Sequence, residues 1–423
     1  MPPVSSPPSP PLAQAAPPST AAPRERLLSL DVFRGLTIAG MLLVNTPGTW
    51  SAIYPPLEHA AWNGWTPTDL IFPFFLFIVG ITTELSLSAR RTRGDDETAI
   101  RRQIVRRGAL IFLFGFLLNG VPFFTWTAIP GNPDPTFLQR VVDRFYDWRL
   151  LGVLQRIGIA YLAAGLIARR ASVRQLVTVV TVILLGYWIA LTALPVPGTH
   201  GTMGALLLNR PEATMAAWWD RFLLDWTRFG LGNHIWPSSV TWDPEGFFST
   251  IPAVATCLIG NLAGRWIVKQ QRPLLDRVSA LFAVGALGMM VGLMWNWVLP
   301  INKSLWSSSY VVFTAGVAAV SLATIIWIVD VQKVKWWVRP WVVYGRNPLI
   351  AYVGSFFMAR MIYSVLSVSY HGRVMPLEEA IFRALFLPWM SPVNASLAFA
   401  IAFVLLWYGI LVALDRRHII LKV

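Results

Sequence analysis

Long apolar runs separated by short polar segments dominate the chain. A helix of about 18 or more apolar residues crosses the hydrocarbon core of a bilayer, so each such run predicts a membrane-spanning helix. The expected fold class is therefore an all-α polytopic integral membrane protein with about ten transmembrane helices. The expected spans lie near residues 30–50, 68–88, 105–123, 151–168, 175–194, 247–266, 277–298, 307–329, 341–366 and 395–414.

The distribution of basic residues predicts the orientation of these spans. Of 35 Lys and Arg residues, 22 fall on the side of the N-terminus, nine fall on the opposite side, and four lie inside spans. Because cytoplasmic loops collect positive charge, both termini are expected in the cytoplasm. The formal charge of +14 is thus spread by topology, so a lipid bilayer is the expected partner and nucleic acid is not.

Composition narrows the function classes further. A chain that is 55% hydrophobic and 13% charged, with a mean hydropathy of +0.55, is not a string of soluble domains. One cysteine excludes a disulfide framework, and the five histidines show no metal-ligand spacing, so no metal is expected.

The segments between spans differ in character. Residues 1–25 are rich in Pro and Ala and are expected to form a disordered cytoplasmic tail, followed by a transmembrane domain over 26–423. A long extracytoplasmic loop near 195–246 contains five tryptophans, which form either an interfacial belt or a platform for a sugar ring. The amphipathic stretch 377–389 is expected to be interfacial or re-entrant, because crossing would make eleven spans.

Ionisable residues inside spans cost on the order of 3 kcal/mol each, so they are functional candidates. Asp31 and Arg34 share one helical face and either pair or bind a ligand. Two spans each carry an arginine next to an amide residue, Gln155-Arg156 and Arg346-Asn347. Their planar donors are able to bind phosphate or carbonyl oxygens, although hydrogen bonds between helices would also explain them. The full set comprises Asp31, Arg34, Asp69, Glu84, Arg156, Arg346 and Arg360.

The first extracytoplasmic loop, 45–69, carries no Lys or Arg and contains His59. An isolated loop histidine is usually solvated and idle, but imidazole is also the commonest general base. Asp69 has two compatible roles. It completes a capping box with Thr66 as N-cap and Pro67 at the first helical position, and it is able to orient an imidazole.

Two further outer segments carry polar groups. Asp243-Pro244-Glu245-Gly246 predicts a helix start with Asp243 as N-cap; the alternative is that Asp243 or Glu245 binds hydroxyls or an ammonium of a substrate. Asn302-Lys303 places one cation in a short loop, as an interfacial anchor or as a contact to an anionic group.

An ordered set of short motifs resembles the heparan-α-glucosaminide N-acetyltransferase family of membrane acetyltransferases. The resemblance covers nearly everything after residue 25. It rests on residues 26–35 (RLLSLDVFRG), 59–66 (HAAWNGWT) with Asp69, 72–73 (FP), 152–156 (GVLQR), 243–246 (DPEG), 302–307 (NKSLWS) and 347–354 (NPLIAYVG).

The resemblance implies an acetyl-CoA-dependent acetyltransferase that moves an acetyl group from cytoplasmic acetyl-CoA to the amino group of an extracytoplasmic glucosamine-type sugar. It maps the catalytic residue onto His59, with Asp69 and Asn45 as further catalytic candidates. Candidates for substrate binding are Trp62, Asn63, Asp243, Glu245, Asn302 and Lys303, and candidates for binding acetyl-CoA are Asp31, Arg34, Gln155, Arg156, Arg346 and Asn347.

One departure affects the expected acceptor and location. A Pro-rich tail stands where the lysosomal enzyme has a lumenal domain and a leading span. This difference suggests a prokaryotic relative in the inner (plasma) membrane that acts on a smaller amino sugar or an envelope glycan. Relatives are dimers, so a homodimer is a further expectation.

The residues support the chemistry of thioester aminolysis. His59 is a base of suitable strength, Asp69 is able to fix its tautomer, and the amide of Asn45 is a donor for the oxyanion. Direct transfer and an acetyl-His59 intermediate both fit. An amino-sugar permease and an O-acyltransferase of cell-surface glycans are the alternatives, because buried charges and an aromatic outer loop suit them as well.

Overall fold

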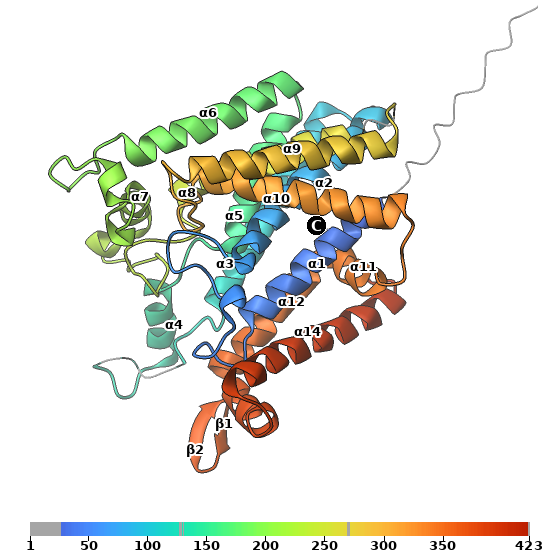
Figure 1. Ribbon diagram of the computed structural model, residues 1–423. Coiled ribbons are helices and arrows are strands. Elements are labelled where there is room, and N and C mark those ends of the chain that lie inside the picture. The colour runs from blue at the N-terminus through green and yellow to red at the C-terminus, as the bar shows by residue number, and fades with distance from the viewer. Residues whose placement is uncertain (1–26, 127–128, 130, 269–270, 422–423) are drawn as a thin grey trace, which may run out of the picture.

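The computed structural model describes residues 27–126, 129, 131–268 and 271–421, and they form a bundle of long helices with one short hairpin (Figure 1). The predicted all-α membrane fold is confirmed. The expected tail at 1–25 lies outside the described residues. The helices are α1 (Leu28–Asn45), α2 (Ile71–Arg93), α3 (Glu97–Gly120), α4 (Phe137–Tyr146), α5 (Val153–Ala168), α6 (Val173–Thr192), α7 (Met215–Leu224), α8 (Phe247–Ile267), α9 (Leu274–Trp295), α10 (Ser308–Ile326), α11 (Arg339–Arg346), α12 (Pro348–Arg360), α13 (Leu377–Ile381) and α14 (Pro392–Arg416).

Each of the ten expected spans coincides with a helix, but only eight helices in the described part of the chain are long and apolar enough to cross a membrane. The two that fall short are α3 and α5. Helix α5 has 16 residues, and the first half of α3 carries arginines at 101, 102, 106 and 107. Both pack against each other inside the bundle, so their membrane depth depends on their neighbours.

The ninth expected span, 341–366, is broken rather than continuous. Asn347 leaves the helical region with φ −122° and ψ 55°, and Pro348 begins α12. The residue before a proline is pushed away from helical geometry, which explains the break. The chain then forms a hairpin of β1 (Ser367–Tyr370) and β2 (Arg373–Pro376), paired antiparallel with Ser367 opposite Pro376. The stretch 377–389 contains only α13 and one π-helical turn, too short to cross a membrane.

The two ends of the bundle differ. The start of α1 and the end of α14 lie at one end (right in Figure 1), whereas α4 and α7 lie at the opposite end with the hairpin (left). The long loop 195–246 is therefore built on the end opposite the termini, and it contains α7 and short 3-10 turns. We call these the terminal end and the loop end of the bundle.

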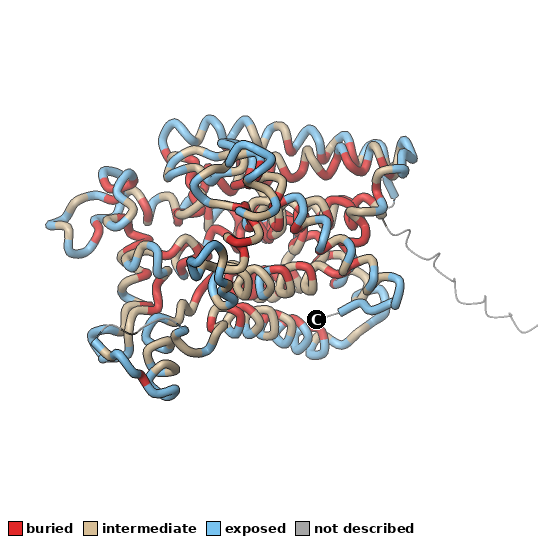
Figure 2. Tube along the Cα trace, turned by 90° about the horizontal axis from the view of Figure 1, so that it is seen from below, coloured by how far each residue is buried: buried red, intermediate tan, exposed pale blue. Residues whose placement is uncertain are grey.

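Burial separates inner from outer helices. In the most apolar 18-residue window, 72% of α8 and 61% of α1 are buried, against 22% of α9 and 28% of α14. Exposed residues lie on the outward faces of helices and in loops, and buried residues lie on the inward faces (Figure 2). The outward apolar side chains, such as Leu287 and Leu405, suit contact with lipid.

Helices α2 and α8 approach each other closely because glycine faces backbone at two points. A Cβ on Gly80 would collide with the carbonyl oxygen of Cys257, and one on Gly260 would collide with the carbonyl oxygen of Phe77. Small residues at such contacts allow the close packing that holds membrane helices together.

The one carboxylate in the middle of α2 is neutralised between these helices. Glu84 is 4% exposed and accepts from Arg91 (3.1 Å) and from Arg265 on α8 (3.2 Å). Arg265 also donates to the carbonyl oxygens of Ala168 and Ala171, which fastens the end of α5 to α8. The ion pairs of Glu84 thus explain why this charged residue is tolerated inside a predicted span: it joins the helices at the terminal end.

We expect Gly80→Ala to destabilise the protein by about 1–3 kcal/mol, because the added methyl must push α2 away from α8. Gly186→Ala in α6 is the matched control, since nothing lies within 4 Å of the point that an added Cβ would occupy and alanine favours a helix. Thermal melting in detergent measures both variants. Equal melting temperatures for Gly80→Ala and the wild type would contradict the close approach.

Candidate active site

His59 lies in the loop between α1 and α2, where Asp69 holds its ring. Asp69 sits in the 3-10 turn Pro67–Leu70 that leads into α2, and its Oδ1 lies 2.7 Å from His59 Nδ1. Its Oδ2 accepts from the backbone N–H groups of Thr66 (3.1 Å) and Ala60 (3.0 Å). The predicted capping box of Thr66 and Asp69 is confirmed. The same buried carboxylate therefore starts the helix and orients the imidazole.

Lys303 brings a cation to the same ring from the loop between α9 and α10. Its Nζ lies 3.0 Å from His59 Nδ1, 3.2 Å from Nε2 and 3.5 Å from Asp69 Oδ1. Burial lowers the pKa of Lys303, and the carboxylates of Asp69 and Glu245 oppose that shift. The His59 side chain itself is 46% exposed, so solutes reach it while the two charges beneath it are shielded.

Backbone and amide contacts join the two loops that carry His59 and Lys303. Gly64 N–H donates to the carbonyl of Ile301 (2.8 Å), and Asn302 Nδ2 donates to Asn63 Oδ1 (3.1 Å). Asn302 is fully buried, and its own Oδ1 accepts from Leu305 N–H (2.8 Å). Asn63 and Asn302, two of the sequence-based candidates for substrate binding, therefore hydrogen-bond to each other and hold the two loops together.

Trp62 links the His59 loop to the long loop. Its Nε1 donates to the carbonyl of Leu208 (2.7 Å), and its ring meets Trp242 edge to face at 5.2 Å. Trp242 in turn meets Trp236 at 5.4 Å. Indoles of the outer loop thus form a row that begins beside the catalytic candidates.

The predicted helix start at Asp243 is wrong. Helix α8 begins at Phe247 with Gly246 as its N-cap, and Asp243 instead accepts from Arg149 Nε at 2.9 Å. Arg149 also bonds Glu245 (2.5 Å). Despite burial, these two carboxylates raise the pKa of Arg149, so it stays charged. The physical reason for the difference is that residues 243–246 close a turn of their own, in which Glu245 N–H donates to Asp243 Oδ1 (2.8 Å) and Gly246 N–H donates to the Asp243 carbonyl (2.9 Å).

A cavity of about 680 Å³, cavity 3, extends through the bundle from the terminal end toward the site. Arg34, Gln103 and Arg107 line it at the terminal end, with Arg346. Its opposite wall includes Phe72, which follows Asp69 by one helical turn. Cavity 3 therefore connects arginines of the terminal end with the first turn of α2, whereas His59, Asp69 and Lys303 do not line it.

Asn45 lies in an adjoining space. It ends α1 and lines cavity 2, of about 370 Å³, which shares Met41, Val153 and Tyr352 with cavity 3. Within the described part of the chain, no hydrogen bond joins Asn45 to His59 or Asp69. The structure thus places this candidate beside cavity 3 rather than on the His59 ring.

The remaining candidates for acetyl-CoA binding divide into two groups. Arg34 and Arg346 line cavity 3, although each also has a carboxylate neighbour, Asp31 at 3.4 Å and Asp415 at 2.8 Å. The others hold the chain together without lining that cavity: Asp31 pairs with Arg34, Gln155 binds the Leu150 carbonyl, Arg156 binds Thr250 and Ser249 of α8, and Asn347 binds Ile419 and Leu421.

Sequence reasoning missed several residues of the site. Tyr310 on α10 donates to the Asp69 carbonyl and fixes the helix start from below. Arg107 and Tyr161 line cavity 3, and Arg107 lies 5.3 Å over the Tyr161 ring. Arginine at a helix end looks like part of the cytoplasmic charge bias, so the sequence carried no sign that Arg107 turns inward. Among the described residues, no group of three or more His, Cys, Asp and Glu is arranged to hold a metal ion.

Comparisons with known proteins identify the family of the chain. Residues 26–296 match the family model "Heparan-alpha-glucosaminide N-acetyltransferase, catalytic". The heparan-alpha-glucosaminide N-acetyltransferase of Mus musculus is 30% identical over 376 residues, which cover 78% of this chain and 53% of the relative. The Homo sapiens protein of the same name is 29% identical over 374 residues, covering 78% and 52%. The chain spans about half the length of these curated relatives. It belongs to the heparan-alpha-glucosaminide N-acetyltransferase family.

Proposed function

We propose that the protein is a membrane N-acetyltransferase that transfers the acetyl group of cytoplasmic acetyl-CoA to the amino group of a glucosamine-type sugar on the other side of the membrane. One observation carries the proposal. A half-exposed imidazole held by a buried carboxylate lies at the loop end, and cavity 3 is lined by arginines of the terminal end and by Phe72, three residues after that carboxylate. Family membership supports the reaction class.

The chemistry of cavity 3 suits acetyl-CoA as the donor substrate. Guanidinium groups at the terminal end provide forked donors for phosphates. Apolar walls that include Phe75, Ile111 and Ile157 suit the pantetheine arm beyond them. The thioester would then reach Phe72, one turn from Asp69, with the termini and the arginines on the cytoplasmic side.

The proposed role of His59 is to accept the proton that the amine loses in the reaction. The sugar nitrogen attacks the thioester carbonyl carbon, a C–N bond forms, the C–S bond breaks and the thiolate of CoA leaves. With its proton on Nδ1 donated to Asp69, His59 accepts the proton of the amine at Nε2 and passes it to the thiolate or to water.

The proposed acceptor side is the loop end. Trp62 and Asn63 lie in the same loop as His59, and the row of indoles continues into the long loop. Indole faces suit the C–H bonds of a pyranose ring. Asn45, in the space that adjoins cavity 3, is the proposed donor to the oxyanion once the thioester is bound.

Purified protein is expected to release free thiol from acetyl-CoA only when an amino sugar is present, and the product should be an amide by mass spectrometry. His59→Ala should lower this rate by a factor of about 100 or more, because the base is lost. Its melting temperature should stay close to that of the wild type, since the ring is half-exposed. Uptake of labelled glucosamine into proteoliposomes without acetyl-CoA, or an ester product, would instead favour a permease or an O-acyltransferase.

Lys303→Met should lower kcat/KM for the amino sugar about tenfold, equivalent to about 1.4 kcal/mol, because the Nζ that contacts both the His59 ring and Asp69 Oδ1 is lost. Lys303→Arg keeps the charge and is the matched control. An unchanged kcat/KM for Lys303→Met would show that Lys303 has no part in the reaction.

Arg107→Gln should raise the KM for acetyl-CoA about tenfold, equivalent to about 1.4 kcal/mol, with a smaller effect on kcat. The buried Arg107 Nε has no hydrogen-bond partner among the described residues, so the group is poised for an added ligand. Arg101→Gln removes an exposed charge from the same helix outside cavity 3 and is the control. Equal KM values for the two variants would remove Arg107 from the donor site.

A further inference from the structure

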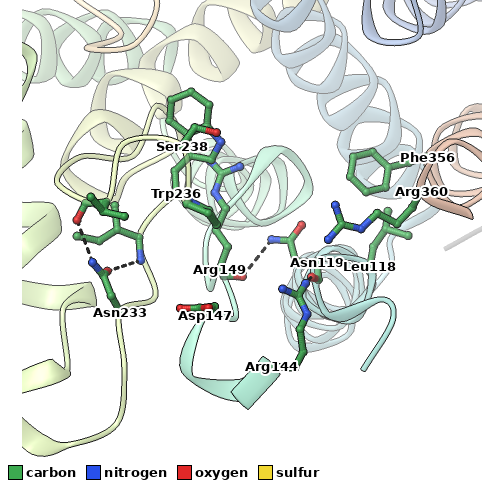
Figure 3. A pocket seen from close by; sticks show the side chains of 13 residues that line it. Leu118, Asn119, Arg144, Asp147, Arg149, Asn233, Trp236, Ser238, Phe356 and Arg360 are labelled. Carbon is green, nitrogen blue, oxygen red and sulfur yellow. Dashed lines mark hydrogen bonds between the residues drawn. The ribbon is translucent and has the colours of Figure 1, made fainter. Parts of the chain in front are cut away.

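A second polar cavity, cavity 1, lies at the loop end and has no part in the reaction described above. It encloses about 620 Å³ between the end of α3, the end of α4 and the long loop. Arg144, Arg149 and Arg360 line it together with Trp236 and Ser238 (Figure 3). Three positively charged guanidinium groups around one cavity repel each other unless carboxylates or other anions lie close to them.

Arg149 is already neutralised by Asp243 and Glu245, but the other two arginines are not. Among the described residues, no carboxylate lies within ion-pair distance of Arg144 or Arg360. The acid that lines cavity 1, Asp147, attracts Arg144 from beyond that distance. Burial and the nearby charge of Arg360 lower the pKa of Arg144. Cavity 1 therefore holds two cations that repel each other.

Three consecutive carbonyls at the end of α3 hold the pair together. Arg144 Nη2 donates to the carbonyl of Asn119 (2.6 Å) and its Nε to that of Gly120 (3.4 Å). Arg360 Nε donates to the carbonyl of Val121 (3.0 Å). These bonds leave Arg144 Nη1 and both Nη atoms of Arg360 without a protein acceptor in the described part of the chain. Such preorganised donors suit the oxygens of an anion.

Cavity 1 is joined to the catalytic loop in two ways. Trp236 in its wall continues through Trp242 to Trp62, which lies three residues from His59. On another side, Phe356 and Arg360 line both cavity 1 and cavity 2, which contains Asn45. Edge-to-face contacts between indoles therefore connect the wall of cavity 1 to the loop that carries His59.

We propose that cavity 1 is a subsite for an anionic group carried by the acceptor glycan, a phosphate, sulfate or carboxylate bound between Arg144 and Arg360. The acceptor is then an acidic amino sugar rather than a neutral one. This inference rests on the proposed function for the position of the amine, but the binding step does not depend on acetyl transfer.

Direct binding to the purified full-length protein, without acetyl-CoA, tests the subsite. Isothermal titration compares glucosamine with glucosamine 6-phosphate, glucosamine 6-sulfate and muramic acid. We expect at least one acidic sugar to bind about ten times more tightly than glucosamine. Arg144→Gln and Arg360→Gln should each bring the affinities for that acidic sugar and for glucosamine to within about threefold. Arg373→Gln, which removes an exposed arginine of the hairpin, should keep the full preference.

Two results would overturn the proposal. The first is that glucosamine and all three acidic sugars bind with equal affinity. The second is that the preference for an acidic sugar persists in both Arg144→Gln and Arg360→Gln. If the arginines only cap α3, the variants would melt at a lower temperature and keep the preference for the acidic sugar. Should Arg144→Gln not fold, Arg144→Lys provides a milder substitution.

Loss of the preference in nanodiscs of phosphatidylglycerol, but not in neutral nanodiscs, would assign the arginines to a lipid headgroup. Failure of thiol release with the preference retained would overturn the proposed function and leave the subsite standing.

Discussion

The carboxylate of Asp69 is the contact on which the site depends. One oxygen holds the His59 ring and the other holds the backbone at the start of the helix that enters the membrane. Lys303 approaches the same oxygen as the ring, which draws the loop after α9 over the loop after α1. A charge that is buried at the start of a helix thereby also orients the His59 imidazole. The same side chain therefore fixes both the position of the His59 ring and the start of α2.

The close fit of α2 and α8 extends this arrangement through the bundle. Glycines at 80 and 260 let the two backbones touch, and Glu84 ties the same helices together at the terminal end. Cavity 3 runs beside this rigid pair, with Phe72 and Val79 of α2 in its wall. One wall of cavity 3 is thus formed by a closely packed helix pair.

Hydropathy and short motifs predicted much of this from sequence. All ten expected spans contain helix, although the ninth is broken at Asn347, and the capping box at Thr66 and Asp69 formed as expected because its contacts are local. Contacts between distant segments could not be predicted from one sequence. Arg149 pairs with Asp243 and Glu245 from 94 and 96 positions away, which no local pattern encodes. Lys303 reaches His59 over 244 positions for the same reason.

Cavity 3 also bears on how a cell keeps its ion gradients. A passage that extends through much of a membrane protein would carry protons if water filled it. Val79, Ile111 and Ile157 place hydrocarbon in its wall, which offers water no hydrogen-bond partner at those positions. An interrupted column of water conducts protons poorly, so a cavity of this length is compatible with an electrically insulating membrane.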